Sequence, residues 1–220
     1  MKRIIWALRV MNWPTCERVL RGPSGKWGWC AEDEREEVPT AETLEQLIDA
    51  GKKFGTIYAD PPWSYGNQAT RSSADKHYTT MPLADICSLP IEQLAAETSH
   101  LHLWTTNGFL REAFDVMDAW GFTYKSCFVW TKPQMGIGNY WRVSHEFMLL
   151  GVRGKLTFAD HGMRSWIEDA RRKHSAKPDV VRDMIEKASP GPRLELFARQ
   201  QAEGWTSWGN QVSPTLFGDK

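Results

Sequence analysis

The sequence predicts an α/β protein in which a mostly parallel sheet carries helices on both faces. Short runs rich in β-branched and aromatic residues alternate with segments that have the apolar spacing of helices, as in sheets with helical crossovers. The chain has 220 residues, 41% of them hydrophobic and 25% charged, which is enough for one substantial domain with its own core. Polar side chains gather directly after several predicted strands, where ligands bind in such sheets.

The expected domain organisation is uneven. Residues 1–38 have no clear period and are rich in glycine, proline and tryptophan, so we expect an irregular extension whose function the sequence does not indicate. Residues 39–220 contain the periodic segments and form the main predicted domain. The chain has twelve tryptophans, which suit a packed core and also permit stacking against bases or a partner.

Charge and cysteine spacing argue against several classes of protein. The formal net charge is zero, so any contact with nucleic acid has to be local, through basic stretches within residues 1–30 and 164–177. Each stretch fits a solvated surface equally well. The four cysteines form no Cys-x-x-Cys pair, which argues against a zinc site and a disulfide framework. No apolar run suits a signal peptide or a membrane span, so a cytoplasmic protein is expected.

The elements of the main domain are predicted in chain order. Thr40 is expected to cap a helix that stops at Gly51, and a buried strand follows over residues 54–59. The polar stretch over residues 64–80 is expected to be either a lid over a site or a surface loop. Ser88 is expected to cap the next helix. The later strands are expected at residues 101–106, 126–131, 145–150, 166–168 and 194–198, and the later helices at 107–120 and 178–188.

The helix predicted over residues 107–120 has the apolar spacing of an amphipathic helix closed by a glycine. The residues expected on its inward face are Phe109, Leu110, Phe114, Met117 and Trp120.

Asp60, Pro61, Pro62 and Trp63 end the first predicted strand and form the most informative stretch. A residue before proline stays extended, and prolines have no N–H group, so the turn carries carbonyl acceptors with few donors to compete for them. A carboxylate, bare carbonyls and an aromatic face would suit a flat ring that bears an amino group. Taken alone, the two prolines more often mark a simple strand-ending turn.

Eight short motifs follow one another along the chain. They are Ala59-Asp60-Pro61-Pro62-Trp63, Leu103-Trp104, Trp130-x-Lys132, His145-Glu146, Gly151-Val152-Arg153-Gly154, Ser175-x-Lys177-Pro178, Glu195-Leu196-Phe197-Ala198-Arg199 and Trp208-Gly209-Asn210-Gln211. In this combination and order, the chain resembles the MT-A70 family of adenine-N6 methyltransferases from about residue 55 to residue 211.

The resemblance implies a Rossmann-like methyltransferase fold that binds S-adenosylmethionine, with a permuted order in which the catalytic motif precedes much of the cofactor site. Residues 39–220 would then be the methyltransferase domain. The chain has neither a Gly-x-Gly-x-x-Gly after its first strand nor a Walker motif. Phosphate binding is therefore unsupported, which suits a cofactor without phosphates.

The resemblance also implies the site residues. We hypothesise that the Asp60 side chain and the Pro61 carbonyl accept the two N–H bonds of the adenine amine and aim its lone pair at the methyl sulfonium, with Trp63 or Tyr65 stacked on the base. The expected catalytic residues are Asp60, Pro61, Pro62 and Trp63, and the expected substrate-binding residues are Tyr65, Tyr78, Lys132, His145 and Glu146. The expected cofactor-binding residues are Asp60, Lys177, Phe197, Arg199, Asn210 and Gln211.

Two of these residues are unusual in their sequence context. Without the resemblance, Glu146 at a strand start is more often a surface residue. Many relatives have Glu where this chain has Gln211, and a Gln side chain can still bond a hydroxyl. No metal ligand set is expected.

The expected function is adenine-N6 methylation of DNA, because the chain is compact and has no obvious RNA-binding appendage. The amine is buried in a duplex, so the base has to be flipped out or single-stranded. Two alternatives remain open: an RNA adenine-N6 methyltransferase, and an inactive partner subunit that binds nucleic acid. The intact Asp60–Trp63 motif disfavours the inactive subunit. Monomer and homodimer both remain open, and no membrane partner is expected.

Overall fold

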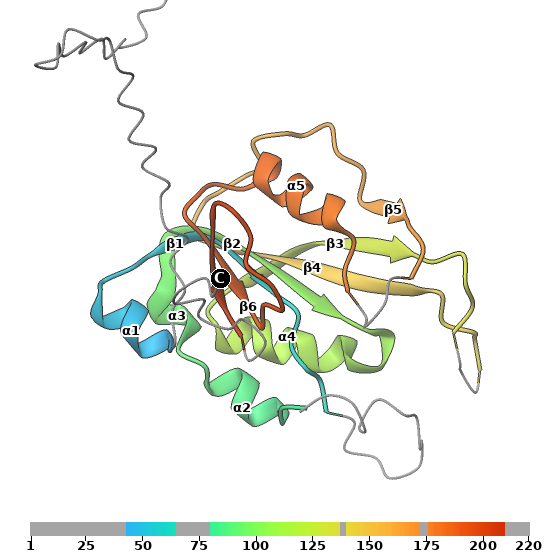
Figure 1. Ribbon diagram of the computed structural model, residues 1–220, viewed down its shortest axis with the longest axis horizontal. Helices are drawn as coiled ribbons and strands as arrows, with labels where there is room; N and C mark the ends of the chain where they lie inside the picture. The colour runs from blue at the N-terminus through green and yellow to red at the C-terminus, as the bar shows by residue number, and fades with distance from the viewer. Residues whose placement is uncertain (1–42, 65–79, 137–139, 172–175, 210–220) are drawn as a thin grey trace, which may run out of the picture. The chain divides into compact units, whose positions relative to one another are not determined.

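The computed structural model describes residues 43–64, 80–136, 140–171 and 176–209 (Figure 1). The predicted extension over residues 1–38 lies outside these ranges, so the division at residue 38 stays a prediction. Most of the polar stretch over residues 64–80, with its expectation of a lid, also lies outside them. The same holds for four of the predicted site residues: Tyr65, Tyr78, Asn210 and Gln211.

A seven-stranded mixed sheet forms the centre of the described chain, in the order β5-β3-β4-β2-β1-β6-β7. β4 runs antiparallel to its neighbours β2 and β3, whereas the other pairings are parallel. The predicted mostly parallel, Rossmann-like fold is therefore confirmed. The strands are β1 (Phe54–Ala59), β2 (Ala95–Thr105), β3 (Thr123–Thr131), β4 (His145–Arg153), β5 (Trp166–Glu168), β6 (Arg193–Leu196) and β7 (Trp205–Trp208).

Helices cover both faces of this sheet, as predicted. In Figure 1, α5 (Asp179–Ala188) lies on one face, and α1 (Leu44–Asp49), α2 (Leu83–Ser88) and α4 (Leu110–Ala119) lie on the other. The two cores follow from the alternation of side chains along each strand. In β1, Ile57 belongs to the core on the face of α1, α2 and α4, whereas Tyr58 belongs to the core under α5.

The start of α1 differs from the prediction. Its cap is Thr43 and not Thr40, because the Thr43 hydroxyl accepts the Gln46 N–H at 3.2 Å and the Gln46 side chain accepts the Thr43 N–H at 3.2 Å. This reciprocal pair is a capping box. The predicted stop is confirmed, since Gly51 has a φ of +66° just after the helix.

Ser88 ends a helix that the sequence did not predict. It is the last residue of α2, and its hydroxyl donates to the Asp85 carbonyl at 2.9 Å. The following helix α3 (Ile91–Leu94) begins after Pro90 without a side-chain cap. The prediction that Ser88 caps this helix is therefore wrong, because the serine serves the preceding turn.

Phe114 is the one wrong member of the predicted inward face of α4. Its side chain is 36% exposed and its ring packs edge-on against Tyr124, with centroids 5.1 Å apart. The position one residue earlier, Ala113, is buried together with Val116 and Met117. Successive helical residues are about 100° apart, so Phe114 turns away from the stripe that Ala113 occupies.

β7 is a further element that the sequence analysis did not predict. It pairs in parallel with β6 at the edge of the sheet, with Leu196 opposite Trp208. β6 itself ends at Leu196, before the predicted end at residue 198, because Phe197 adopts a φ of +60° and leaves the strand.

Candidate active site

Four predicted site residues from distant parts of the chain meet at the carboxyl-terminal edge of the sheet. Asp60 follows β1, Lys132 follows β3, and Lys177 precedes α5. Glu146 is the second residue of β4, and because β4 is antiparallel, its beginning lies where its neighbours end. The edge predicted to bind ligands in this class of sheet is thus the edge where these side chains gather.

The four side chains form a chain of alternating charges, which we call the edge network (Asp60, Lys177, Glu146 and Lys132). Lys177 Nζ lies 2.6 Å from Asp60 Oδ2 and 3.4 Å from Glu146 Oε2. Lys132 Nζ donates to the other carboxylate oxygen of Glu146. Each of these side chains is at most 24% exposed. The network links residues that the sequence analysis divided between substrate and cofactor.

Two buried tryptophans form the wall beneath the edge network. Lys177 Nζ lies 5.4 Å from the ring centroid of Trp104, and Lys132 Nζ lies 4.2 Å from that of Trp130. The two indole rings meet edge to face at 6.1 Å. Trp104 is held by its own ring nitrogen, which donates to the Tyr58 hydroxyl at 2.8 Å. Cations over aromatic faces are attracted to them, so this wall helps to keep both ammonium groups at the edge.

The pKa values of the network show which charges it favours. Burial acts to lower the pKa of Lys177, but the carboxylates of Asp60 and Glu146 outweigh it, so this pKa lies above its usual value. Burial acts to raise the pKa of Glu146, but Lys177 and Lys132 outweigh it, so this pKa lies below its usual value. For Lys132, burial dominates and lowers the pKa despite the contact with Glu146.

The turn after β1 uses the prolyl carbonyls for its own backbone. The Pro61 carbonyl accepts the Trp63 N–H at 2.9 Å, and the Pro62 carbonyl accepts the Met81 N–H at 2.8 Å. The expectation that few donors compete for these carbonyls therefore needs correction. A carbonyl oxygen has two lone pairs, so Pro61 retains one acceptor position beside Asp60.

Trp63 anchors this turn to the core. Its Nε1 donates to the Trp104 carbonyl at 3.2 Å, and its ring stacks on Phe109 with centroids 5.4 Å apart and an interplanar angle of 16°. One ring face is therefore covered by protein. The expectation that Trp63 stacks on a base stays a prediction and applies to the ring face opposite Phe109.

The backbone after β6 comes close to the end of β7. The Ala198 N–H donates to the Trp208 carbonyl at 2.9 Å, and the rings of Phe197 and Trp208 meet at 5.5 Å. A Cβ at Gly209 would collide with the backbone of Ala198, so only glycine fits there. Phe197 lies at the end of the strand next to β1, on the same edge as Asp60, and the Arg199 side chain is exposed two residues later.

The structure does not bring His145 into the edge network. His145 and Glu146 are neighbours in β4, so their side chains point to opposite faces. The His145 ring instead meets Phe147 edge-on at 4.8 Å. The prediction that His145 contacts substrate stays untested, and its place is on the sheet face that α4 covers.

A comparison with models of protein families shows which family shares this sheet and its edge network. A model of the MT-A70 family matches residues 54–211, which include the whole described sheet and the edge network. The chain belongs to the MT-A70 family. Members of this family are N6-adenine methyltransferases.

Three MT-A70 relatives illustrate the range of the similarity. The chain is 33% identical over 196 residues to the type II methyltransferase M.MunI of a Mycoplasma species. It is 29% identical over 190 residues to the N6-methyladenosine RNA methyltransferase MTA1 of Pyricularia oryzae, and 28% identical over 194 residues to the N(6)-adenine-specific methyltransferase METTL4 of mouse. These alignments cover 77–79% of this chain.

The relatives differ more in length than in identity. The alignment spans 83% of the Mycoplasma protein, 50% of the Pyricularia protein and 40% of the mouse protein. A relative from Medicago truncatula, named as a putative N(6)-adenosine-methyltransferase, is spanned over only 28% of its length. The shared part is therefore the methyltransferase core, and what the longer relatives add lies outside it.

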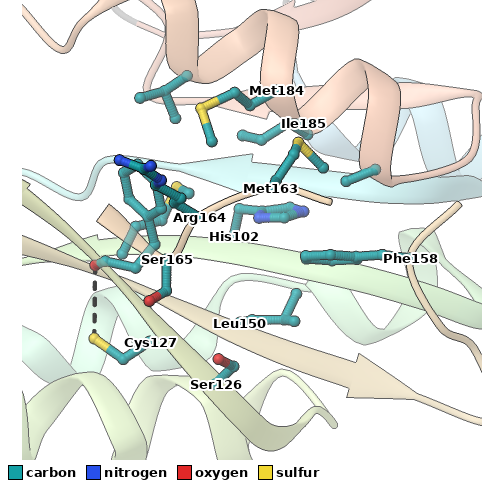
Figure 2. A pocket seen from close by; sticks show the side chains of 14 residues that line it. His102, Ser126, Cys127, Leu150, Phe158, Met163, Arg164, Ser165, Met184 and Ile185 are labelled. Atoms are coloured by element: carbon teal, nitrogen blue, oxygen red, sulfur yellow. Dashed lines mark hydrogen bonds between the residues drawn. The ribbon is translucent and has the colours of Figure 1, made fainter. Parts of the chain in front are cut away.

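One cavity among the described residues is separate from the MT-A70 edge network. It has a volume of about 160 Å³ and lies between α5 and the strands β2, β3 and β4, with Met184 and Ile185 on the helix side (Figure 2). None of the predicted site residues lines it. Pockets for cofactor-sized ligands are usually about 300 Å³ or more, so the cavity is too small for one.

His102 borders this cavity and belongs to a second polar cluster. Its Nε2 and the Nδ1 of His100 each lie 2.9 Å from the Ser189 hydroxyl, and its ring stacks on Phe158. Burial, with a contribution from His100, lowers the pKa of His102 to about 3. We call His100, His102 and Ser189 the His–Ser–His cluster. Burial lowers the pKa of both histidines, so both are neutral at ordinary pH.

Trp104 and Trp130 are the site residues that the predicted lists omitted. Both stand in motifs of the family resemblance, but the sequence predicts each only as part of a strand. The sequence signal that could have identified them is an aromatic residue one position before the end of each strand, next to Thr105 in β2 and Thr131 in β3.

Among the described residues, no group of three His, Cys, Asp or Glu is placed to hold a metal ion. No described helix has the length and apolar content to cross a bilayer.

Proposed function

We propose that this chain transfers a methyl group from S-adenosylmethionine to the N6 amine of adenine in DNA, with the target base flipped out or single-stranded. The observation that supports this most is the position of the Asp60 carboxylate. It stands at the end of the interior strand β1, one residue before Pro61, and its Oδ2 accepts from Lys177 Nζ at 2.6 Å. Asp60 Oδ1 and the Pro61 carbonyl are then two acceptors on neighbouring residues, which supports a site for an amine.

The residues of this chain would orient the amine for attack. The adenine amine is a poor nucleophile because its lone pair is delocalised into the ring. Since Lys177 occupies Oδ2 of Asp60, we assign one N–H of the amine to Asp60 Oδ1 and the other to the second lone pair of the Pro61 carbonyl. Accepting both N–H bonds favours a pyramidal nitrogen, and positioning of this kind supplies much of enzymatic rate acceleration.

The proton balance fits the same atoms. As the carbon–nitrogen bond forms, the methyl–sulfur bond of the sulfonium would break and leave a neutral thioether. One proton then has to leave the nitrogen, and Asp60 Oδ1 would be the acceptor already bonded to it. Lys177 would stay protonated throughout, because the carboxylates of Asp60 and Glu146 raise its pKa. Its positive charge therefore balances Asp60 before the transfer without competing for the released proton.

The residues present fit the cofactor chemically. S-adenosylmethionine, when bound, supplies an electrophilic methyl group on a sulfonium and carries a carboxylate, an ammonium group and no phosphate. Asp60 and Lys177 offer the opposite charges for the methionine end, and the Phe197 ring stands at the same edge of the sheet. The close approach of Gly209 to the Ala198 backbone leaves the sheet edge free of a side chain there.

DNA is the proposed nucleic acid because of the similarity to the type II methyltransferase. The chain is 33% identical to that protein and 28–30% identical to three relatives whose names specify adenosine or RNA. The methyltransferase core is common to all of them. An RNA substrate is therefore the second arm of the test.

The test measures transfer of labelled methyl groups to matched DNA and RNA oligonucleotides, single-stranded and duplex. We expect methylation of adenine in DNA, and a loss of roughly 100-fold or more in kcat for Asp60→Asn, which keeps the size of the side chain but weakens its acceptor. Cofactor affinity of the variant, measured by calorimetry, separates lost binding from lost chemistry. Wild-type protein that labels only RNA would overturn the DNA assignment, and full activity of Asp60→Asn would overturn the role of Asp60.

A further inference from the structure

The connection between β3 and β4 carries exposed aromatic side chains that the edge network does not use. We call the described residues 133–136 and 140–144 the β3–β4 arm. The side chains of Tyr140 and Trp141 are 95% and 90% exposed, and Arg142 beside them is exposed too. In Figure 1 the arm extends past the tip of β3. Large aromatic side chains this exposed are unusual without a ligand or partner.

The base of the arm is held by the backbone. The ladder of β3 and β4 continues past both strands, because the Lys132 N–H donates to the Ser144 carbonyl at 2.7 Å and the Gly136 N–H donates to the Val143 carbonyl at 2.9 Å. The Arg171 N–H donates to the Gln134 side chain at 3.2 Å, which ties the arm to the segment after β5. The aromatic pair is thus presented from an ordered base.

The arm itself carries the basic side chain of Arg142 and no acidic one, while Glu168 and Asp169 pair with the end of β3 beside it. Residues 132–144 contain no Asp or Glu. The Arg171 guanidinium lies against the arm, since a Cβ at Gly136 would meet its Nη2 at 2.8 Å. Its charge also reaches Lys132, where it adds to the effect of burial in lowering the pKa. The chain as a whole has zero net charge, so this is a local feature that complements a phosphate backbone.

Exposed aromatic faces beside cationic side chains are what proteins use to bind single-stranded nucleic acid. Bases stack on the rings whatever their identity, and the cations follow the phosphates. The arm begins directly after Lys132 and ends two residues before Glu146, so its base adjoins the edge network. A strand whose target adenine reaches Asp60 would therefore pass the arm with its neighbouring nucleotides.

We propose that the β3–β4 arm binds the nucleic-acid strand next to the target adenine, with Trp141 and Tyr140 stacking on unpaired bases and Arg142 and Arg171 contacting phosphates. This inference rests on the proposed function, because it needs a nucleic-acid substrate at the edge network. It assigns affinity for the strand to residues that take no part in methyl transfer.

The test compares the Tyr140→Ala, Trp141→Ala double variant with the wild type. Binding of a fluorescein-labelled single-stranded DNA 12-mer containing one adenine is followed by fluorescence anisotropy. Each lost base stack is expected to weaken binding roughly 5- to 150-fold, whereas Trp141→Phe, which keeps a ring, loses much less. Tyr124→Ala is the matched control, because Tyr124 is 41% exposed at the opposite end of β3; its affinity should equal that of the wild type.

Two further measurements decide between the outcomes. Weaker DNA binding with unchanged cofactor affinity by calorimetry and unchanged mass by light scattering supports the arm as a nucleic-acid surface. A mass that falls in the double variant assigns the aromatic pair to contact with a second copy and overturns the inference. Unchanged DNA affinity in the double variant, with methylation by the wild type intact, overturns the inference alone. Wild-type protein that neither binds nor methylates any oligonucleotide overturns the proposed function and the inference together.

Discussion

The edge network and the His–Ser–His cluster are two buried polar groups on one sheet with opposite character. Asp60, Lys177, Glu146 and Lys132 lie at the carboxyl-terminal edge and are charged, with each ion paired. His100, His102 and Ser189 lie under α5 and are neutral, with one hydroxyl serving both rings. A buried charge is costly unless it is paired, so charge is retained where chemistry needs it and neutral polar groups serve where only packing does.

This contrast predicts that the two clusters respond to different perturbations. Removing a charge from the edge network should reduce both catalysis and stability. Removing a polar group from the His–Ser–His cluster should reduce stability and leave catalysis unchanged. The predictions below test the contrast in order of expected effect.

Lys177→Ala should give the largest change. It leaves the Asp60 and Glu146 carboxylates close together without the cation between them, so we expect kcat to fall roughly 100-fold or more. The free energy of unfolding should fall by about 3 kcal/mol, as when one partner of a buried ion pair is removed. Methyl-transfer kinetics and urea denaturation measure the two effects. Lys177→Arg keeps the charge and should be less affected in both; equal loss in the two variants would contradict a role based on charge.

Acidification should reveal the His–Ser–His cluster first. The pKa of His102 falls from 6.5 to about 3 on folding, so the unfolded chain takes up a proton that the folded chain does not between these values. Stability should therefore fall by about 1.4 kcal/mol per pH unit as the pH drops below 6.5. Burial lowers the pKa of His100 as well, so His100 adds to the slope in the same direction. His102→Gln should remove the His102 share of the slope without changing kcat at pH 7.5.

The pH window of the edge network lies lower. The pKa of Glu146 is depressed below 4.5, so its contribution to stability is present above pH 4.5 and is lost as the pH falls below it. Urea denaturation from pH 7.5 to 3.5 thus separates the clusters. A His102→Gln protein with the full wild-type slope between pH 6.5 and 4.5 would contradict the assignment of that slope to His102.

Ser189→Ala should give the smallest change. It removes one hydroxyl that bonds two buried imidazoles, and a loss of about 1–3 kcal/mol is expected when buried polar atoms lose their partner. Thermal unfolding measures the loss, and methyl-transfer activity at 25 °C should match the wild type. A large fall in kcat without a fall in stability would mean that α5 transmits the change to the edge network.

The sequence predicts local features of this molecule better than distant ones. The strand β1 and its end at Asp60 follow from a run of β-branched and aromatic residues stopped by two prolines. The contact of Lys177 with Asp60 joins residues 117 positions apart, and no spacing rule predicts it. The family resemblance assigns both residues to the binding of ligands and says nothing of a contact between them. Their ion pair is therefore information that only the fold provides.

Errors in the predicted elements arose where one signal fitted two structures. Ser88 matched a helix cap because Pro90 and an apolar run follow it, yet it closes α2. β7 escaped prediction because it is only four residues long and follows Gly204. Its two central residues, Thr206 and Ser207, are both polar, a pattern that also suits a turn. The direction of β4 is not encoded in its apolar run, since parallel and antiparallel strands can bury the same residues.

The antiparallel direction of β4 has a consequence for redesign. Because β3 and β4 form a hairpin, Thr131 pairs with His145 and the Lys132 N–H bonds the Ser144 carbonyl, so both ends of the arm are fixed at the network. The residues between them can change in length or sequence without moving Lys132 or Glu146. The arm is thus a natural graft point, at which chimeric enzymes could exchange their affinity for the neighbouring strand while keeping one methyl-transfer centre.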